Sequence, residues 1–314
     1  MIKVGIIGAA GYTAGELIRI LVNHPEAEIV WAQSSSNAGN PVTAVHEGLL
    51  GDTDLVFSEE CNFSNVDVVF LCSGHGKSSE FWASHPKPAG LKVIDLAQDF
   101  RDESNGYVYG LPEWQKEKIS RATLVANPGC FATSIQLALL PFTCVHGLDS
   151  EIQVTAITGS TGAGVKPGAT THYSWRYGNI STYKVFEHQH LLEICRNLGT
   201  KNINFVPVRG DFARGIFASV YTDCDMSEEA AVKLYKDYYK DAPFTIVSDS
   251  AVDLKQVVNT NKCVLHVEKH GSKLVISSVI DNLLKGASGQ AVENMNLMFG
   301  LPQTAGLKLK ASAF

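Results

Sequence analysis

Residues 2–21, IKVGIIGAAGYTAGELIRIL, determine the fold that we expect for the N-terminal part of the chain. An apolar run at Lys3–Ile7 predicts a buried strand, a glycine-rich turn follows it, and Ala14–Asn23 has a helical pattern that ends before Pro25. This order is typical of a dinucleotide site, where small residues let the backbone approach a pyrophosphate at the helix N-terminus. The loop reads GxxGxxA rather than GxGxxG, so a tight turn without a ligand is the alternative interpretation.

The following residues continue the pattern of a parallel sheet. Glu28–Gln33, 66–73 and 91–97 are short apolar runs, as expected for strands that are covered on both faces. Asp95 and Asp99 lie at the end of the last run, at the sheet edge where α/β folds bind their ligands. We therefore predict an α/β domain with strands and helices in alternation.

After residue 130 the pattern changes to alternating apolar and polar residues, which is typical of half-exposed antiparallel strands. The segments are EIQVTAITGS (151–160), INFVPVRG (203–210), GIFASVYTDC (215–224) and CVLHVEKHGSKLVISSVID (263–281). Helical patterns occur around HQHLLEICRNLG, in SEEAAVKLYKDYYKD and in the C-terminal GASGQAVENMNLMFGL. We predict a second, mostly antiparallel domain.

The stretch LVANPGCFATSIQLALLPF (124–142) presents Cys130 at the start of a long apolar, helix-like run. The rigid turn at 127–129 favours a helix N-terminus, where unpaired N–H groups and the helix dipole stabilise a nucleophilic thiolate. A buried, inert cysteine is the alternative, and we prefer that interpretation for the other cysteines. A nucleotide fold with an activated cysteine indicates hydride transfer to or from a cysteine-bound acyl group.

His188, His190 and Glu193 lie together in FEHQHLLEI (186–194). In an extended segment both imidazoles would share one face, whereas in a helix His190 would meet Glu193 and form a general acid/base oriented by a carboxylate. A metal site and a surface helix with incidental histidines are the rival interpretations.

Two arginines follow in RGDFARGIF (209–217). Arg209 and Arg214 each have the planar group that binds a carboxylate or phosphate through two hydrogen bonds, and an exposed strand end is the alternative for either. The glycine spacing of TGSTGAGVKPG (158–168) predicts a mobile loop, a candidate lid over the site.

The segment Gln33–Asn37, QSSSN, follows the second predicted strand. It lacks the acidic residue that would bind a ribose 2′-hydroxyl, and its hydroxyl and amide groups can donate hydrogen bonds to a 2′-phosphate. This favours NADP as the cofactor, with a solvated polar loop as the alternative.

The bulk composition narrows the function classes. A net charge of −6 gives no general attraction to nucleic acid or to an anionic membrane, and no apolar run reaches the roughly 18 residues of a membrane span. The seven cysteines are odd in number and include no CxxC pair, so we expect reduced thiols and a cytoplasmic location.

With these residues in view, the chain resembles the N-acetyl-gamma-glutamyl-phosphate reductase family of arginine biosynthesis over nearly its whole length. The resemblance is carried by the ordered blocks GAAGYTAGEL, VIDLAQDFR, YGLPEW, ANPGCFATS, GSTGAGVKPG, HQHLLEI, FARGIFASVY and DNLLKGASGQAVENMNLMFG. It implies an α/β fold with a Rossmann-type parallel-sheet cofactor domain at 1–135 and 286–314. It also implies an α+β substrate and dimerisation domain with a mostly antiparallel sheet at 136–285, and a homo-oligomer, a dimer or a tetramer.

The resemblance implies an NADPH-dependent oxidoreductase that converts N-acetyl-glutamyl 5-phosphate to the 5-semialdehyde and phosphate through a thioester on a catalytic cysteine. Cys130 matches the nucleophile, His188 and His190 match the HxH pair that supplies a proton, and Arg214 matches the arginine that holds the substrate carboxylate. Substrate binding is also expected of Glu193 and Asn127, and no metal is expected. The expected cofactor-binding residues are Gly8, Ala10, Gly11, Tyr12, Thr13, Ser34, Ser36 and Ser73.

Two departures from the family pattern concern the cofactor. The loop has Ala14 where the family has the glycine of GYTG, and Ser35 or Ser36 stands where the family has an arginine near the 2′-phosphate. An aspartate-semialdehyde dehydrogenase-like enzyme and a non-enzymatic nucleotide-sensing regulator are the alternatives, since the cysteine block alone also fits the former.

Overall fold

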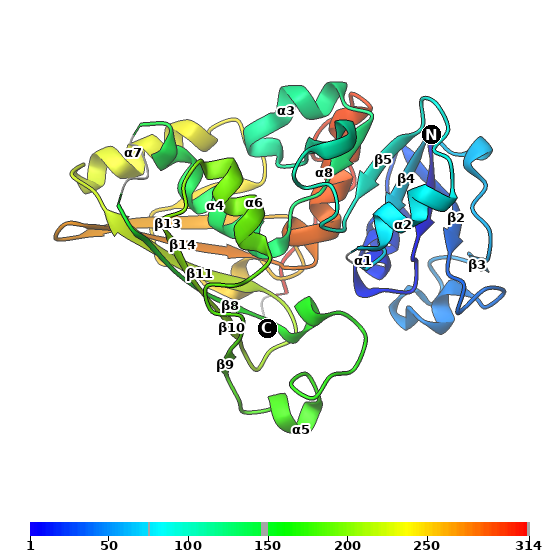
Figure 1. The fold of residues 1–314 in the computed structure, drawn as a ribbon, viewed down its shortest axis with the longest axis horizontal. Coiled ribbons are helices and arrows are strands. Elements are labelled where there is room, and N and C mark those ends of the chain that lie inside the picture. The colour runs from blue at the N-terminus through cyan, green and yellow to red at the C-terminus, as the bar shows by residue number, and fades with distance from the viewer. Residues whose placement is uncertain (75, 146–149, 313–314) are drawn as a thin grey trace. The chain divides into compact units, whose positions relative to one another are not determined.

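The computed structural model describes residues 1–74, 76–145 and 150–312 (Figure 1). Its packing divides the chain into two units. The first unit comprises Met1–Pro128 and Ala287–Lys308, and the second comprises Gly129–Gly286 and Leu309–Phe314. Within the part of the chain that the structure describes, no helix is both long enough and apolar enough to cross a membrane.

The first unit contains a parallel sheet of seven strands in the order β3-β2-β1-β4-β5-β7-β6. Every pairing in it is parallel, which confirms the predicted Rossmann-type sheet. The strands are β1 (Ile2–Ile7), β2 (Ala27–Gln33), β3 (Phe57–Ser58), β4 (Val68–Leu71), β5 (Lys92–Asp95), β6 (Val108–Tyr109) and β7 (Leu124–Ala126). The four residues of β4 are all fully buried, as the continuous apolar run predicts.

Four helices complete the first unit: α1 (Tyr12–Leu21), α2 (Lys77–Ser84), α3 (Pro112–Arg121) and α8 (Gly289–Met298). The C-terminal helix α8 packs against α1, α3 and β5, and all ten of its residues are buried. Short turns of 3₁₀ helix lie at Val42–Ala44, Glu47–Leu49, Phe63–Asn65 and Ser104–Gly106.

The second unit contains a mixed sheet in the order β12-β13-β14-β11-β8-β10-β9. Four pairings are antiparallel, as predicted, while β8 pairs with β10 and β12 with β13 in parallel. The strands are β8 (Ile152–Thr158), β9 (Ser181–Thr182), β10 (Ile203–Arg209), β11 (Ile216–Asp223), β12 (Thr245–Ser248), β13 (Cys263–His270) and β14 (Lys273–Ile280). The parallel β8–β10 pair is possible because a long connection that includes a helix joins these strands.

Helices α4 (Cys130–Thr143), α6 (His190–Leu198) and α7 (Glu228–Tyr239) cover one face of this sheet (Figure 1). A single turn, α5 (Tyr173–Arg176), lies in the connection before β9, and further helical turns lie at Ser160–Ala163, Leu254–Gln256 and Leu284–Ser288. The boundary expected after residue 135 would cut α4, whereas the observed division precedes α4 because this helix packs on β11, β13 and β14. The tail at Leu309–Phe314 joins the second unit, where Asn259 donates a hydrogen bond to the Lys310 carbonyl (3.2 Å).

Helix α4 carries a proline near its C-terminal end, and α7 compensates for it. Pro141 has no N–H to donate to the carbonyl of Leu137, four residues before it. The Tyr239 hydroxyl donates to that carbonyl at 2.6 Å, and the Tyr235 hydroxyl donates to the next one, on Ala138, at 2.5 Å. Both tyrosines are buried, so α7 satisfies a carbonyl that no water reaches.

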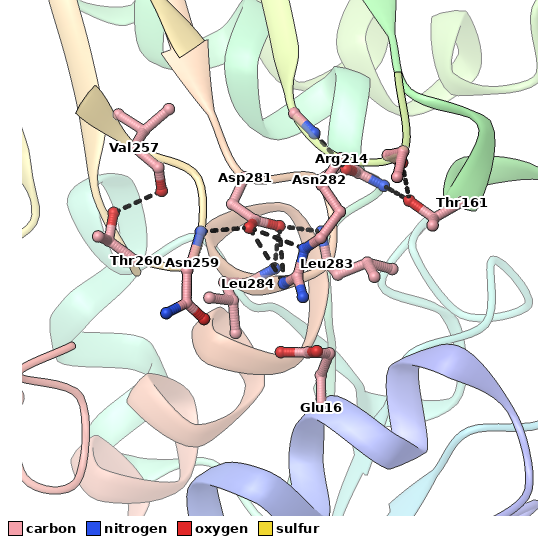
Figure 2. Close-up of polar contacts among 12 residues, drawn as sticks. Glu16, Thr161, Arg214, Val257, Asn259, Thr260, Asp281, Asn282, Leu283 and Leu284 are labelled. Atoms are coloured by element: carbon pink, nitrogen blue, oxygen red, sulfur yellow. Dashed lines mark hydrogen bonds and ion pairs between the residues drawn. The ribbon is translucent and has the colours of Figure 1, made fainter. Parts of the chain in front are cut away.

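The turn after β14 is organised by Asp281, a fully buried carboxylate (Figure 2). It accepts hydrogen bonds from the backbone N–H groups of Asn259 (2.7 Å) and Leu283 (2.8 Å). Arg214 donates to both of its oxygens, from Nε at 3.1 Å and from Nη2 at 3.2 Å. The adjacent Asn282 accepts from the Gly215 N–H at 2.7 Å, so this turn holds the strand entrance at 214–215.

The role of Tyr239 predicts a loss of stability on removal of one oxygen atom. Tyr239→Phe leaves the buried Leu137 carbonyl without its donor, and we expect a loss of about 1–3 kcal/mol in the free energy of unfolding of the second unit. Urea denaturation followed by tryptophan fluorescence measures it. The matched control is Tyr221→Phe, at a side chain that is 40% exposed, which should have the stability of the wild type. Equal midpoints for the two variants would contradict this role of α7.

Candidate active site

Helix α4 begins at Cys130, as the sequence predicts. The preceding Gly129 has an extended backbone (φ −72°, ψ 154°), and its carbonyl accepts hydrogen bonds from the N–H and the hydroxyl of Thr133, at 2.8 and 3.1 Å. The first N–H groups of a helix have no carbonyl partner within it, so an anionic sulfur at this position is stabilised by the helix end. The Cys130 side chain is half-buried, which leaves it accessible to a substrate.

Gly286 makes the closest approach to this cysteine. A Cβ added at Gly286 would lie 2.7 Å from the Cβ of Cys130 and 3.2 Å from its Cα, so only glycine fits. Gly286 also donates its N–H to the Asp281 carbonyl at 3.0 Å. Sequence reasoning did not single out Gly286, because a contact across 156 positions leaves no local pattern.

His188 and His190 lie together although they are two residues apart. Helix α6 starts only at His190, so His188 precedes the helix and its ring folds back, 4.7 Å from the ring of His190. The His190 N–H donates to Nδ1 of His188 at 3.2 Å, which places the proton of neutral His188 on Nε2. Both rings also contact Phe131, the residue after the cysteine, at 5.2 and 6.2 Å between centroids.

Glu193, on the first turn of α6, is buried and binds the start of α4. Its carboxylate accepts the N–H of Gly129 at 3.2 Å. This contact joins α6 to the residue before the cysteine, and the orientation of His190 by Glu193 stays a prediction. Glu193 therefore positions the helix that carries Cys130.

Tyr183 and Arg209 complete the cluster in the second unit. The Tyr183 ring lies 5.8 Å from the His188 ring, and the Arg209 guanidinium carbon lies 4.4 Å from the centre of the Tyr183 ring. Burial raises the pKa of Tyr183 to about 12, with a smaller lowering by the charge of Arg209 and a further raising by the sulfur of Cys130. Tyr183 is thus a neutral phenol within electrostatic range of both residues. Sequence reasoning missed Tyr183, since a lone tyrosine in a loop carries no signal.

The two other residues expected to bind substrate have protein partners. Arg214 is engaged with Asp281, as Figure 2 shows. Asn127 lies in the first unit and is almost fully buried, where its amide donates to the Ala287 carbonyl (3.0 Å) and accepts from Asn294 (3.0 Å). These contacts give Asn127 a structural role between β7 and α8.

The first half of the glycine-rich segment at 158–168 is hydrogen-bonded to the backbone of residues 212–213. The N–H groups of Ser160 and Thr161 donate to the carbonyls of Phe212 and Ala213 at 2.9 and 3.1 Å. A Cβ on Gly159 would lie 2.4 Å from the Ala213 carbonyl oxygen, so the two backbones are in close contact. These contacts pack residues 159–161 along the 212–213 backbone, and a mobile lid formed by the segment stays a prediction.

The glycine loop of the first unit has the shape of a phosphate-binding turn. Gly8 has a positive φ (+73°), and a Cβ there would lie 3.1 Å from the backbone of Cys72 and Ser73. Gly11 is the N-cap residue of α1 and has no side chain that could accept a hydrogen bond from the helix. The N–H groups at Tyr12 and Thr13, in the first turn, therefore lie at a helix end without a side-chain cap. His46, which sequence reasoning missed, supports the loop by a hydrogen-bond contact from Nε2 to the Ala9 carbonyl (2.8 Å).

The serine turn after β2 is internally hydrogen-bonded. Ser34 is buried, and Asn37 donates to the hydroxyl oxygens of Ser34 (3.3 Å) and Ser36 (3.0 Å). Ser35 accepts from the Gln33 amide at 3.0 Å. Ser35 and Ser36 are exposed, and because their oxygens accept these bonds, their own O–H groups can donate outward.

The remaining candidates of the sequence analysis have structural surroundings. Asp99 accepts the N–H groups of Gly76 (2.8 Å) and Ser79 (3.2 Å) and so caps α2. Burial raises the pKa of the Cys61 thiol to about 11 and that of Cys72 to about 12, which keeps both protonated. Across residues 1–74, 76–145 and 150–312, no group of three His, Cys, Asp or Glu side chains is placed to hold a metal ion.

Residues 3–122 match the family model described as "Semialdehyde dehydrogenase, NAD binding domain", and residues 130–282 match "Semialdehyde dehydrogenase, dimerisation domain". The chain therefore has an NAD-binding domain followed by a dimerisation domain of this type.

Solved structures share the fold. Aspartate semialdehyde dehydrogenase II from Vibrio cholerae, complexed with ASA, has a TM-score of 0.74 at 18% identity and covers 96% of this chain and 98% of its own. Aspartate semialdehyde dehydrogenase with NADP from Candida albicans has a TM-score of 0.72 at 14% identity, over 95% of this chain and 98% of its own. At these identities the likeness concerns the fold alone.

Much more similar sequences carry a different name. The N-acetyl-gamma-glutamyl-phosphate reductases of Azobacteroides pseudotrichonymphae and Phocaeicola vulgatus are each 57% identical to this chain over the full length of both proteins. That of Flavobacterium johnsoniae is 51% identical, again over both full lengths. The chain belongs to the N-acetyl-gamma-glutamyl-phosphate reductase family.

Proposed function

We propose that the chain reduces N-acetyl-glutamyl 5-phosphate to the 5-semialdehyde and phosphate, with Cys130 as the nucleophile and NADPH as the preferred reductant. The observation that carries this proposal is the position of Cys130 at the N-terminus of α4, in one unit with two adjacent buried imidazoles. The relatives that are 57% identical bear the name of this reaction.

The covalent step follows from the chemistry of the thiolate. The Cys130 sulfur attacks the acyl carbon, a carbon–sulfur bond forms, the carbon–oxygen bond to phosphate breaks, and phosphate leaves. The N–H groups of the first turn of α4 stabilise the negative charge on the acyl oxygen. A thioester on Cys130 is the product of this step.

The glycine loop fits a dinucleotide, because the space beside Gly8 is too narrow for a side chain and the N-terminus of α1 is open to an anion. When bound, the reduced nicotinamide supplies a hydride. The residues that would hold the dinucleotide are those of the loop from Gly8 to Thr13, which include Ala10 and Gly11, and the backbone at Ser73. The O–H groups at Ser35 and Ser36, with no acid from Gln33 to Asn37, favour a 2′-phosphate.

We assign proton transfer to the pair formed by His188 and His190. Reduction of the thioester places negative charge on the substrate oxygen, and an N–H of this pair donates a proton to it. The same imidazole takes the proton back as the carbon–sulfur bond breaks, which leaves the aldehyde and the Cys130 thiolate. His188 has Nε2 as its N–H donor, because Nδ1 accepts from the backbone. Glu193 contributes by fixing Gly129, and Arg214 by fixing the turn at Asp281.

We also propose that the chain works as a homo-oligomer, either a dimer or a tetramer, in the cytoplasm. The match of residues 130–282 to a dimerisation domain supports the oligomer. Large apolar side chains of this domain are exposed in the single chain, among them Tyr173, Tyr177 and Leu192. Sedimentation analysis of the purified chain tests the oligomeric state.

The reaction itself is tested by following NADPH oxidation and phosphate release with N-acetyl-glutamyl phosphate and with aspartyl phosphate. We expect turnover of the former, and selective turnover of aspartyl phosphate would assign the enzyme to the other substrate. If neither acyl phosphate were turned over, the result would favour the alternative of a non-enzymatic nucleotide-sensing regulator.

Cys130→Ser tests the nucleophile. A serine hydroxyl is not ionised at a helix end, which shifts a pKa only modestly, so kcat should fall by roughly 10⁴-fold or more while nicotinamide binding persists. The control is Cys144→Ser, which changes the exposed cysteine at the other end of the same helix and should keep full activity. A kcat near the wild-type value for Cys130→Ser would exclude the covalent route.

Gly286→Ala tests the position of the nucleophile. The added methyl would overlap the Cβ of Cys130, and a shift of this residue should lower kcat by roughly 10²-fold with unaltered nicotinamide affinity. Gly48→Ala is the matched control, because nothing lies within 4 Å of a Cβ at Gly48 and its φ is not positive. Equal kcat values for the two variants would show that α4 tolerates a side chain at this contact.

Ser36→Asp tests cofactor selection. We expect the wild type to prefer NADPH modestly, since it lacks an arginine at this turn, and to use NADH as well. An aspartate would repel the 2′-phosphate and accept from a ribose hydroxyl, which should change the ratio of the two kcat/KM values by roughly tenfold or more toward NADH. The uncharged Ser36→Asn should leave the preference in place. A wild-type preference for NADH would refute our interpretation of the serine turn.

A further inference from the structure

Arg209, the last residue of β10, differs from Arg214 in having no carboxylate partner among the residues that the structure describes. Its Nε is buried and makes no hydrogen bond, and none of the ion pairs among the residues that the structure describes includes it. Arg214, in contrast, is paired with both oxygens of Asp281. A buried donor without an acceptor is unfavourable, so the guanidinium of Arg209 is suited to an external anion.

The backbone at Arg209 is fixed by a second arginine. Arg176 is buried and donates from Nη1 to the Arg209 carbonyl at 2.7 Å and to the Asn179 carbonyl at 3.1 Å. It also donates to Thr170 and Ser181, so five hydrogen bonds in all hold it in one conformation. Because the backbone of Arg209 is anchored in this way, its side chain starts from a fixed position, which favours the recognition of a ligand.

The guanidinium itself lies over an aromatic ring. Arg209 stacks on Tyr183 at 4.4 Å, which orients its planar group and restricts its rotation. Arg176 lies within electrostatic range of both Arg209 and the carboxylate of Asp211, and Asp211 accepts the Gly178 N–H at 2.6 Å. The neutral Tyr183 hydroxyl beside Arg209 is a second donor to the same anion.

The stacked pair of Arg209 and Tyr183 belongs to the cluster of side chains around Cys130. Tyr183 contacts His188, and His188 contacts Phe131, the residue that follows Cys130. We propose that Arg209, stacked on Tyr183, binds the carboxylate of the substrate and so determines which acyl phosphates reach Cys130. The proposal rests on the proposed function and replaces Arg214 in the role of the carboxylate clamp.

A carboxylate fits this site better than the phosphate does. A stacked guanidinium presents two parallel N–H groups in one plane, which match the two oxygens of a carboxylate. The carboxylate also remains on the substrate through the acyl and the aldehyde stages, whereas the phosphate leaves in the first step. Arg209 therefore holds the one anionic group that both steps share.

The test uses the phosphorylating direction, in which the semialdehyde, inorganic phosphate and NADP⁺ are separate reactants with separate KM values. Arg209→Gln should raise the KM of the semialdehyde by about 10- to 100-fold, the loss expected for a charge-assisted pair, and leave the KM of phosphate unchanged. Arg209→Lys, which keeps the charge but not the planar group, should show an intermediate value. A rise confined to the KM of phosphate would assign Arg209 to the phosphate instead, and unchanged constants would overturn the proposal.

A substrate without the carboxylate separates binding from a general disturbance. With 4-acetamidobutanal, which equals the semialdehyde minus its carboxylate, wild type and Arg209→Gln should have the same kcat/KM. A further loss in the variant with this aldehyde would mean that Arg209 only supports the structure. Absence of turnover of N-acetyl-glutamate 5-semialdehyde by the wild type would overturn the proposed function and this assignment with it, whereas a wild type and a variant that are equally active on that semialdehyde would overturn the assignment alone.

Discussion

The start of helix α4 is the constraint on which the proposed chemistry depends. The buried carboxylate of Glu193 accepts the N–H of Gly129 at 3.2 Å, and Gly286 leaves room for the Cβ of Cys130 by having no side chain. These two contacts come from α6 and from the turn after β14, far apart in the sequence. A hydrogen bond from a helix-end N–H to a carboxylate is charge-assisted and therefore stronger than one between neutral groups. This bond holds the start of α4, and with it Cys130, near His188 and His190, whose rings both contact Phe131.

The same helix links the reactive residue to the rest of the second unit. The hydroxyl of Ser278 donates to the Ser134 carbonyl at 3.0 Å, so β14 is joined to the first turns of α4. β14 then leads into Asp281, which binds Arg214 and orders the strand entrance. At the other end, Tyr239 satisfies the carbonyl that Pro141 leaves open. A buried helix that is held by these contacts near both ends is rigid enough to present a sulfur atom in one position.

Local sequence patterns predict the elements of this protein well and their long-range partners poorly. The strand, glycine turn and helix of residues 2–21, the parallel sheet and the start of α4 at Cys130 follow from periodicity and turn chemistry. The partner of Arg214 lies 67 residues away at Asp281, and the glycine that faces Cys130 lies 156 residues away. Arg209 and Arg214 are equivalent as sequence, and only their three-dimensional surroundings distinguish an arginine that is paired within the protein from one that faces the site.

The central claim is that the acyl group of the substrate becomes bonded to Cys130 before reduction. Mass spectrometry of the protein after brief incubation with N-acetyl-glutamyl phosphate, without nicotinamide and quenched in acid, tests this claim most directly. We predict one added N-acetyl-glutamyl group, located on the peptide that contains Cys130 and absent from Cys130→Ser, with the release of an equal amount of phosphate. An unmodified protein that still reduces the substrate when NADPH is added, or an adduct on another cysteine, would contradict the claim.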